Sequence, residues 1–464
     1  RPLVCRRELV CAASPGFCRM NSISTRLKAI RLPALGGEPR PPASGNLVPL
    51  IVVAGTLLTL AVGQVAQARG VDWRAETQPL FIIFDPVFAG WALLAIGGLT
   101  LSLLAGFRLW KANLPARWFG VVLFGLTLLT RLALNLARHG PSDWWEVFES
   151  YPGHDFEYLS ALPELRNGLG PLLENFDKLV PTLPAHAAGH PPGLLVLIDW
   201  LGITSPQGLA ALTIGVGAMA TPLVYALGRR LFDEATARAA ALLFVFVPTS
   251  LLYGATSADA MFVTLALIAV VWLLSERKSV VVAGAAALAL ASFFSYALLA
   301  AGGWAGLVRW RRDGFRSMAA TALACGMALV VFYAALEAFT GFDVVAAIDA
   351  TNLRYHDGIA NVRPYAFWVF GSPAAFLLML GPVAWFAARS LASREITAVA
   401  LTAIIVVTSL IGYTKAETER IWLFLVPLAC LAAARALPER AFKPVLVAMT
   451  AQAFLIEILF ATRW

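Results

Sequence analysis

Charged side chains are scarce in this sequence. Asp, Glu, Lys and Arg together make up 14% of the 464 residues, whereas 59% of the residues are hydrophobic. A water-soluble domain built around one core carries about 25% charged residues, so this class of protein is excluded. Apolar runs recur from Leu47 onward, and many can cross a hydrocarbon layer of roughly 30 Å as a helix. We therefore expect an all-α polytopic membrane protein.

Several familiar motifs are also missing. No Gly-rich loop of the nucleotide-binding type is found, which favours a substrate carried by lipid rather than by nucleotide. The five cysteines have no metal-ligand spacing, and we expect no disulfide. The sequence has no internal repeat and no matching pair of broken helices, which counts against a secondary transporter. The formal charge of +8 comes from Lys and Arg in short loops, so it indicates topology rather than nucleic-acid binding.

The apolar runs predict about thirteen membrane-crossing helices, with the N-terminus in the cytoplasm. They cover residues 47–65, 87–107, 119–137, 207–227, 236–251, 259–274, 280–293, 297–308, 318–336, 366–387, 396–412, 421–435 and 445–462. Every short cytoplasmic loop is then basic, as the positive-inside rule requires. Most acidic residues fall on the outer segments, which are 138–206, 252–258, 294–296, 337–365 and 413–420.

Two segments do not fit a simple crossing. Residues 1–46 are basic and rich in Pro and Gly, so we expect a disordered cytoplasmic tail without a cleavable signal peptide. Residues 1–19 precede Met20 and are expected to be an artefact of upstream translation. The apolar run 191–203 would span only about 20 Å as a helix, so we expect it to lie on or dip into the outer leaflet. Residues 47–464 then form one transmembrane domain.

The largest outer loop carries the first candidate site. Its motif PGHDFEYL places Asp155 and Glu157 two residues apart, just after a Pro-Gly turn. A carboxylate in this position can accept a proton from an incoming hydroxyl or hold a metal ion. The alternative is that Asp155 caps a helix expected at residues 156–165. The loop ends in AAGHPPGLL, where His190 lies at the membrane surface, or where the two prolines form only a rigid bend.

The last outer loop, residues 413–420, carries cationic candidates. A cation just outside the hydrocarbon is where a polyprenyl phosphate headgroup would lie, and a guanidinium binds phosphate oxygens through two hydrogen bonds. Arg420 is therefore the favoured phosphate ligand. Its alternatives are snorkelling and pairing with Glu417 or Glu419. The loop at 337–365 is expected either to close over substrate as a lid or to be a surface connection.

The order of these motifs resembles the C-type membrane glycosyltransferase superfamily, especially protein O-mannosyltransferases and lipid A aminoarabinose transferases. The resemblance covers roughly residues 119–300 and continues through ALGRRLFDEATARAAALLFVFVPTSLLYGATSADA. In that superfamily a second acidic position lies near the end of this run, and here it falls on Asp259. The sequence departs from the family there, since Ser257-Ala258-Asp259 replaces a longer acidic motif. A plain helix N-cap is the alternative for Asp259.

The resemblance implies transfer of a sugar from a polyprenyl phosphate donor, with inversion, at the extracytoplasmic face of the plasma (inner) membrane. Asp155 or Glu157 would be the general base, while Arg420, Lys415 and Arg363 would bind the donor phosphate. Residues that would orient the substrates are Tyr158, His190, His356, Asp259, Glu417 and Glu419.

No cofactor is required by this scheme, although it is compatible with a divalent metal. The acceptor is a glycan, a lipid or a protein, and membrane lipid surrounds the chain; no nucleic acid is expected as a partner. Two other functions stay open: a transporter or flippase of a lipid-linked sugar, and a non-catalytic membrane assembly subunit.

Overall fold

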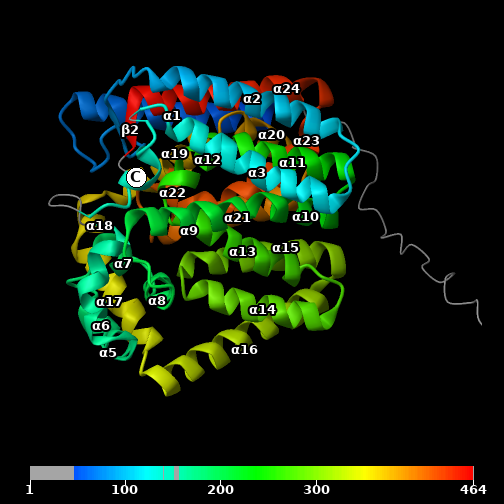
Figure 1. Cartoon of the computed structure of the whole chain (residues 1–464). Helices are drawn as coiled ribbons and strands as arrows, with labels where there is room; N and C mark the ends of the chain where they lie inside the picture. The colour runs from blue at the N-terminus through cyan, green and yellow to red at the C-terminus, as the bar shows by residue number, and fades with distance from the viewer. Residues whose placement is uncertain (1–45, 139, 151–155, 463–464) are drawn as a thin grey trace, which may run out of the picture. The chain divides into compact units, whose positions relative to one another are not determined.

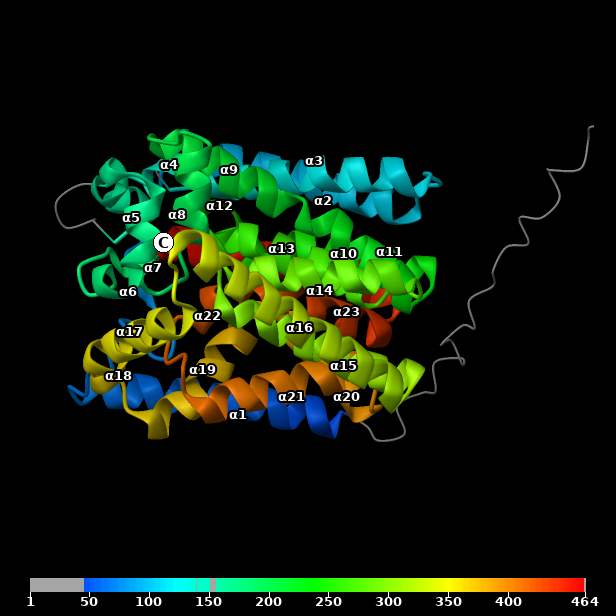
Figure 2. The same cartoon turned by 90° about the horizontal axis from the view of Figure 1, so that it is seen from below.

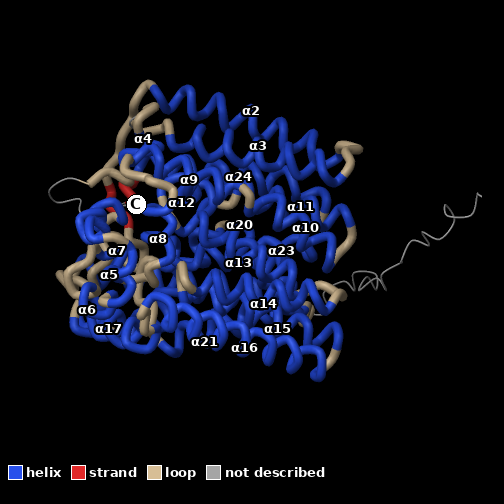
Figure 3. Tube along the Cα trace, turned by 60° about the horizontal axis from the view of Figure 1, so that its bottom comes forward, coloured by secondary structure: helices blue, strands red, loops and turns tan. Residues whose placement is uncertain are grey.

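Long helices dominate the computed structural model, which describes residues 46–138, 140–150 and 156–462. In the described part, six helical segments are long and apolar enough to cross a membrane. They are α1 (Leu47–Ala68), α2 (Trp91–Lys111), α3 (Ala116–Asn135), the α9–α10 pair (Pro206–Leu231), α16 (Phe315–Thr340) and α24 (Glu439–Leu459). Figure 3 shows how little of the trace is strand or loop.

Two further spans are bent pairs of helices. The axis turns by 57° between α11 (Glu234–Phe246) and α12 (Pro248–Thr256), and by 111° between α19 (Tyr365–Leu380) and α20 (Pro382–Ala392). With these pairs, up to eight segments can cross a membrane. The shorter apolar helices are α13 (Asp259–Leu273), α14 (Lys278–Ser292) and α21 (Ile396–Ile411), and α15 (Leu299–Asp313) and α23 (Val426–Ala436) pack among them. The short helices η2 (Tyr296–Leu298), α22 (Thr418–Ile421) and η3 (Trp422–Leu425) adjoin them.

The expectation of an α-helical membrane protein is confirmed in this coarse form, while thirteen crossings and their orientation stay predictions. Two expected single helices are wrong. Residues 236–251 break because Pro248 has no N–H to donate into the preceding turn. Residues 366–387 break at Gly381, whose backbone angles (φ 54°, ψ −135°) suit only glycine. The expected helix at 156–165 is a 3-10 helix, η1 (Tyr158–Asn167).

Short helices from the chain segments 140–203 and 344–362 gather at one end of the long helices, as Figures 1 and 2 both show. We call this group the cap. Its members are α4 (Asp143–Glu146), η1, α5 (Leu169–Glu174), α6 (Phe176–Leu179), α7 (Ala185–Ala188), α8 (Gly193–Trp200), α17 (Val344–Asp357) and α18 (Ile359–Val362). Arg354 of α17 donates to the carbonyls of Val180 and Leu183, so the two segments are tied together. The apolar run at 191–203 forms the short helix α8 of the cap.

A small antiparallel ribbon also lies at the cap end, which an all-α prediction does not include. Strand β1 (Ile82–Phe84), from the α1–α2 loop, pairs with β2 (Phe460–Thr462) after the last helix. Arg138 strengthens this junction by donating to the Asp85 carboxylate at 2.8 Å and to the Glu457 carbonyl at 2.9 Å. The α1–α2 loop is therefore fixed beside the cap.

The opposite end of the helices carries the basic loops (right in Figure 1). Arg238 of α11 donates to the carbonyls of Ala112 and Leu114 in the α2–α3 loop. Lys111 pairs with Glu439 at 3.1 Å, which brings the start of α24 to the same place. Basic loops that are distant in the sequence thus share one end of the helices, and their cytoplasmic side stays a prediction.

We predict that Gly381→Ala destabilises the protein strongly. An alanine would keep a backbone conformation that is strained for any residue with a Cβ, at a cost of about 1–3 kcal/mol. Its Cβ would lie 2.2 Å from Oε1 of Gln452, which donates through Nε2 to the Leu378 carbonyl. The midpoint of thermal unfolding in detergent should therefore fall. In the control, Gly326→Ala, the new Cβ meets nothing within 4 Å, and a comparable fall there would contradict the explanation.

Candidate functional site

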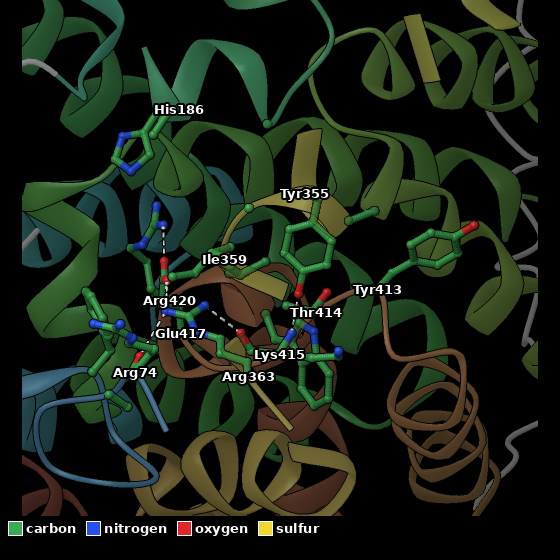
Figure 4. A pocket seen from close by; sticks show the side chains of 18 of the residues that line it. Arg74, His186, Tyr355, Ile359, Arg363, Tyr413, Thr414, Lys415, Glu417 and Arg420 are labelled. Carbon is green, nitrogen blue, oxygen red and sulfur yellow. Dashed lines mark hydrogen bonds and ion pairs between the residues drawn. The ribbon is translucent and has the colours of Figure 1, made fainter. Parts of the chain in front are cut away.

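A cavity of about 1300 Å³ lies between the cap and the long helices (Figure 4). Five segments form its wall: the α1–α2 loop, the region of α7, the η2–α15 segment, the α17–α18 region, and the chain from α21 into η3. The charged side chains of the wall are Asp72, Arg74, Glu76, Arg354, Arg363, Lys415, Glu417 and Arg420. Cations outnumber anions among them, so the wall is suited to an anionic ligand.

A buried chain of ion pairs organises this wall. Arg420 donates through Nη1 to Oδ2 of Asp259 at 2.8 Å and through Nη2 to Oε2 of Glu417 at 3.3 Å. The other carboxylate oxygen of Glu417 accepts from Nη2 of Arg363 at 2.8 Å. The side chain of Arg363 is only 3% exposed and that of Arg420 only 6%. We call these four residues the charge chain. It joins the start of α13 to two separate segments, one after α18 and one after α21.

The backbone that carries Glu417 is held in an unusual conformation. Ala416 and Glu417 both have positive φ angles, 67° and 60°. Such angles cost free energy in residues other than glycine, so the surroundings must hold them. Hydrogen bonds from Ser372 Oγ to the Thr414 carbonyl at 3.1 Å and from Lys415 N to Tyr355 Oη at 2.9 Å do so. This strained turn aims the Glu417 carboxylate between the two arginines.

A second polar group, from the segment between α4 and α8, lies beside the charge chain. Nδ1 of His186 lies 2.9 Å from Oε1 of Glu157, and Tyr158 Oη lies 3.0 Å from Nδ1 of His190. Burial lowers the pKa of His190, although Asp259 opposes this shift, so its ring is neutral at pH 7. Burial also raises the pKa of the Tyr158 phenol, which keeps its proton. Both histidines line the cavity.

Apolar side chains form another part of the cavity wall. Ala297 and Ala300 come from the start of the η2–α15 segment, Ile348 from α17, Ile411 from the end of α21, and Phe424 from η3. The cavity is therefore amphiphilic, because its wall combines charged side chains with apolar side chains from α17 and from η2, α15, α21 and η3. Such a cavity fits a ligand with an anionic group and a hydrocarbon part.

The structure brings most of the residues predicted for the site together. Five of them line the cavity: His190, Arg363, Lys415, Glu417 and Arg420. Three others lie one layer behind and contact lining residues: Glu157 behind His186, Tyr158 behind His190, and Asp259 behind Arg420. The pairing of Arg420 with Glu417, one of the alternatives considered for it, is present.

Three predicted residues are placed differently or not described. Glu419 is buried and faces away from the cavity, where its Oε1 accepts from the backbone N–H of Phe81 at 2.6 Å. His356 is exposed and stacks edgewise on Tyr355, with ring centroids 5.6 Å apart. Asp155 lies outside the described residues.

Sequence reasoning missed the α1–α2 loop, which supplies Arg74, Gln78 and Phe81 to the cavity wall. A cytoplasmic N-terminus and a first crossing at 47–65 would put this loop on the outer side, so its charged residues could have marked it as a candidate for the site. It also missed His186, which lies one helical turn before His190. Among the described residues, no group of three His, Cys, Asp or Glu side chains could hold a metal ion.

The fold and the cavity together define a helical membrane protein with a buried, charged site at one end of its helices. Comparison with models of known protein families and with curated proteins finds no match for this chain.

We predict a pH dependence of stability from Glu419, which lies in α22, outside the membrane-spanning helices. Burial raises the pKa of its carboxyl from 4.5 to about 7. The folded state thus keeps a proton that the unfolded chain releases, so stability falls as the pH rises from 4.5 through 7. Glu419→Gln keeps an acceptor for Phe81 and cannot ionise. At pH 8 it should be more stable than wild type by about 3 kcal/mol, measured by chemical unfolding in detergent. An unchanged pH slope in this variant would refute the assignment.

We also predict that Glu417→Ala destabilises the fold at neutral pH. Burial raises the pKa of this carboxyl, but the combined effect of Arg363 and Arg420 in lowering it is larger. The pKa of Glu417 therefore lies below its usual value. Its loss leaves two buried guanidinium groups without their shared anion, at a cost of about 3 kcal/mol. The exposed acid Asp357 provides the control, because Asp357→Ala should change the unfolding free energy by less than about 0.5 kcal/mol. Equal effects of the two changes would argue against a special role for the charge chain.

Proposed function

We propose that this protein transfers a sugar from a polyprenyl phosphate donor to an acceptor hydroxyl on the extracytoplasmic face of the membrane. The observation that supports this most is the amphiphilic cavity. Its cationic wall suits the phosphate and its apolar wall suits the first part of the lipid tail. A donor of this kind needs both properties in one site, at the level where the helices end.

The cations would stabilise the charge that develops as the lipid phosphate departs. Hydrogen-bond donors that are already in place need little rearrangement when that charge forms. Each such donor commonly increases the rate by about 10²–10³-fold. Arg420 and Arg363 are held by their bonds within the charge chain. Lys415 is less constrained, since its Nζ donates at 3.0 Å to one backbone carbonyl, that of Ala360.

The acceptor hydroxyl must lose its proton during transfer, and Asp155 stays the base proposed from the sequence. For Glu157 we propose a different role from the one first considered. Its carboxylate is 4% exposed and pairs with His186, so it would orient that imidazole rather than touch the acceptor. His186 and His190 would then position the sugar or the acceptor through hydrogen bonds.

Transfer of labelled sugar in proteoliposomes tests the proposal. Wild type, supplied with a panel of polyprenyl phosphate sugars, should consume one donor and form a labelled product. Asp155→Asn should bind that donor but lose turnover by about 10²–10⁴-fold. Lys415→Ala should lower the rate by about 10²-fold, because one stabilising cation is lost. Donor binding and product formation are measured separately for each variant.

The exposed cap residue Arg166 provides the matched control, since Arg166→Ala removes a cation outside the cavity and should leave the rate unchanged. If Asp155→Asn is fully active, Asp155 is not the base. If labelled lipid crosses the bilayer without donor consumption, the protein is a flippase. If wild type neither consumes nor moves any donor, the assembly-subunit alternative replaces the enzyme.

A further inference from the structure

A second cavity, of about 490 Å³, lies at the end of the helices opposite the cap. Residues from only two places line it: the end of α2 and the start of α24. Both helices are long and apolar enough to cross a membrane, and they pack against each other. The cavity therefore opens where two spanning helices leave the hydrocarbon, at the end that carries the basic loops.

The charges of this second cavity are mostly positive. Lys111, Arg440 and Lys443 contribute three cations, and Glu439 contributes one anion. The Lys111–Glu439 pair has an N–O distance of 3.1 Å, but both side chains are about two-thirds exposed at 67% and 71%. An exposed pair of this kind contributes little free energy, so it is readily rearranged by a competing anion.

Aromatic rings lie beside the cations of the second cavity, and Trp110 lines it. Trp110 stacks on Phe442 across the two helices, with ring centroids 4.0 Å apart and an angle of 29°. The ammonium of Lys111 lies 5.5 Å from the Trp110 ring, and that of Lys443 lies 5.4 Å from the Phe107 ring. Contact with the ring faces favours these cation positions, so two of the three cations are held near the cavity. A tryptophan in this place is also typical of the membrane interface.

Apolar surface continues from the cation cluster toward the middle of the membrane. Leu104 precedes Lys111 by seven residues and Val447 follows Lys443 by four, so each lies on the same helix face as its cation. Both side chains are well exposed, at 46% and 47%. On each of these two neighbouring helices, an exposed apolar side chain therefore lies about 6–10 Å closer to the middle of the membrane than the cation at the interface. A free anion would contact only the cations, whereas a phospholipid would contact both the cations and the apolar surface.

We propose that this second cavity binds the headgroup of an anionic phospholipid, with an acyl chain lying along Leu104 and Val447. Basic pockets between spanning helices are suited to such headgroups, and each cation near the surface contributes about 1 kcal/mol, or about fivefold in affinity. Glu439 opposes binding because it repels the lipid phosphate. The site is separate from the cavity under the cap and does not depend on the proposed sugar transfer.

Native mass spectrometry of the full chain in detergent tests this site. With added phosphatidylglycerol or phosphatidylcholine, wild type should retain phosphatidylglycerol preferentially. Lys111→Gln, Arg440→Gln and Lys443→Gln should each weaken retention about fivefold, and the triple variant should bind both lipids equally. Glu439→Gln should instead strengthen phosphatidylglycerol binding by about fivefold, a gain that a damaged fold would not produce.

The control is a second triple variant, Arg277→Gln with Lys278→Gln and Arg311→Gln, which removes three exposed cations from loops at the same end but outside the cavity. It should retain phosphatidylglycerol as wild type does. Equal losses in the two triple variants would mean that only general surface charge attracts the lipid, and the site would be rejected. Displacement of the lipid by inorganic phosphate at equal concentration would likewise overturn the proposal, because the cavity would then bind a free anion.

Discussion

The carboxylate of Glu417 is the group on which the rest of the site depends. It lies between Arg363 and Arg420, and Arg420 in turn reaches Asp259 at the start of α13. Buried charges are tolerated only when they are paired and hydrogen-bonded, so this arrangement fixes where three distant segments of the chain lie. The left-handed backbone at Ala416 and Glu417 persists because these contacts, with those of the adjoining loop, hold it.

The two cavities follow the same physical rule. Each lies where apolar helices leave the hydrocarbon, and each combines cations with adjacent apolar surface. They differ in burial, since the cations of the charge chain are almost fully covered whereas Lys111 is 67% exposed. The buried site can hold a group in one geometry, as transfer chemistry requires. The exposed site suits reversible contact with surrounding lipid.

Much of the helical framework was predictable because it follows local rules. Apolar run length locates apolar helices, and each expected span overlaps helical segments of the described chain, although 445–462 runs into strand β2 and the thirteen crossings stay predictions. The bends at Pro248 and Gly381 were harder to predict, since either residue can also lie within or beside a straight helix. Arg420 was predicted from its place at the mouth of two helices, and Lys415 and Arg363 from the family resemblance; all three line one cavity.

The sequence by itself determined that the helices are apolar enough for a membrane, and it determined which kinds of residue lie at the helix ends. Both follow from composition and from short spacings of hydrophobic and charged residues. Only the tertiary structure decided which of those residues meet. Glu417 and Glu419 lie two positions apart in one loop, yet one joins the charge chain and the other faces Phe81. Their difference depends on packing against segments 54 and 338 residues away in the sequence, and no local pattern encodes such contacts.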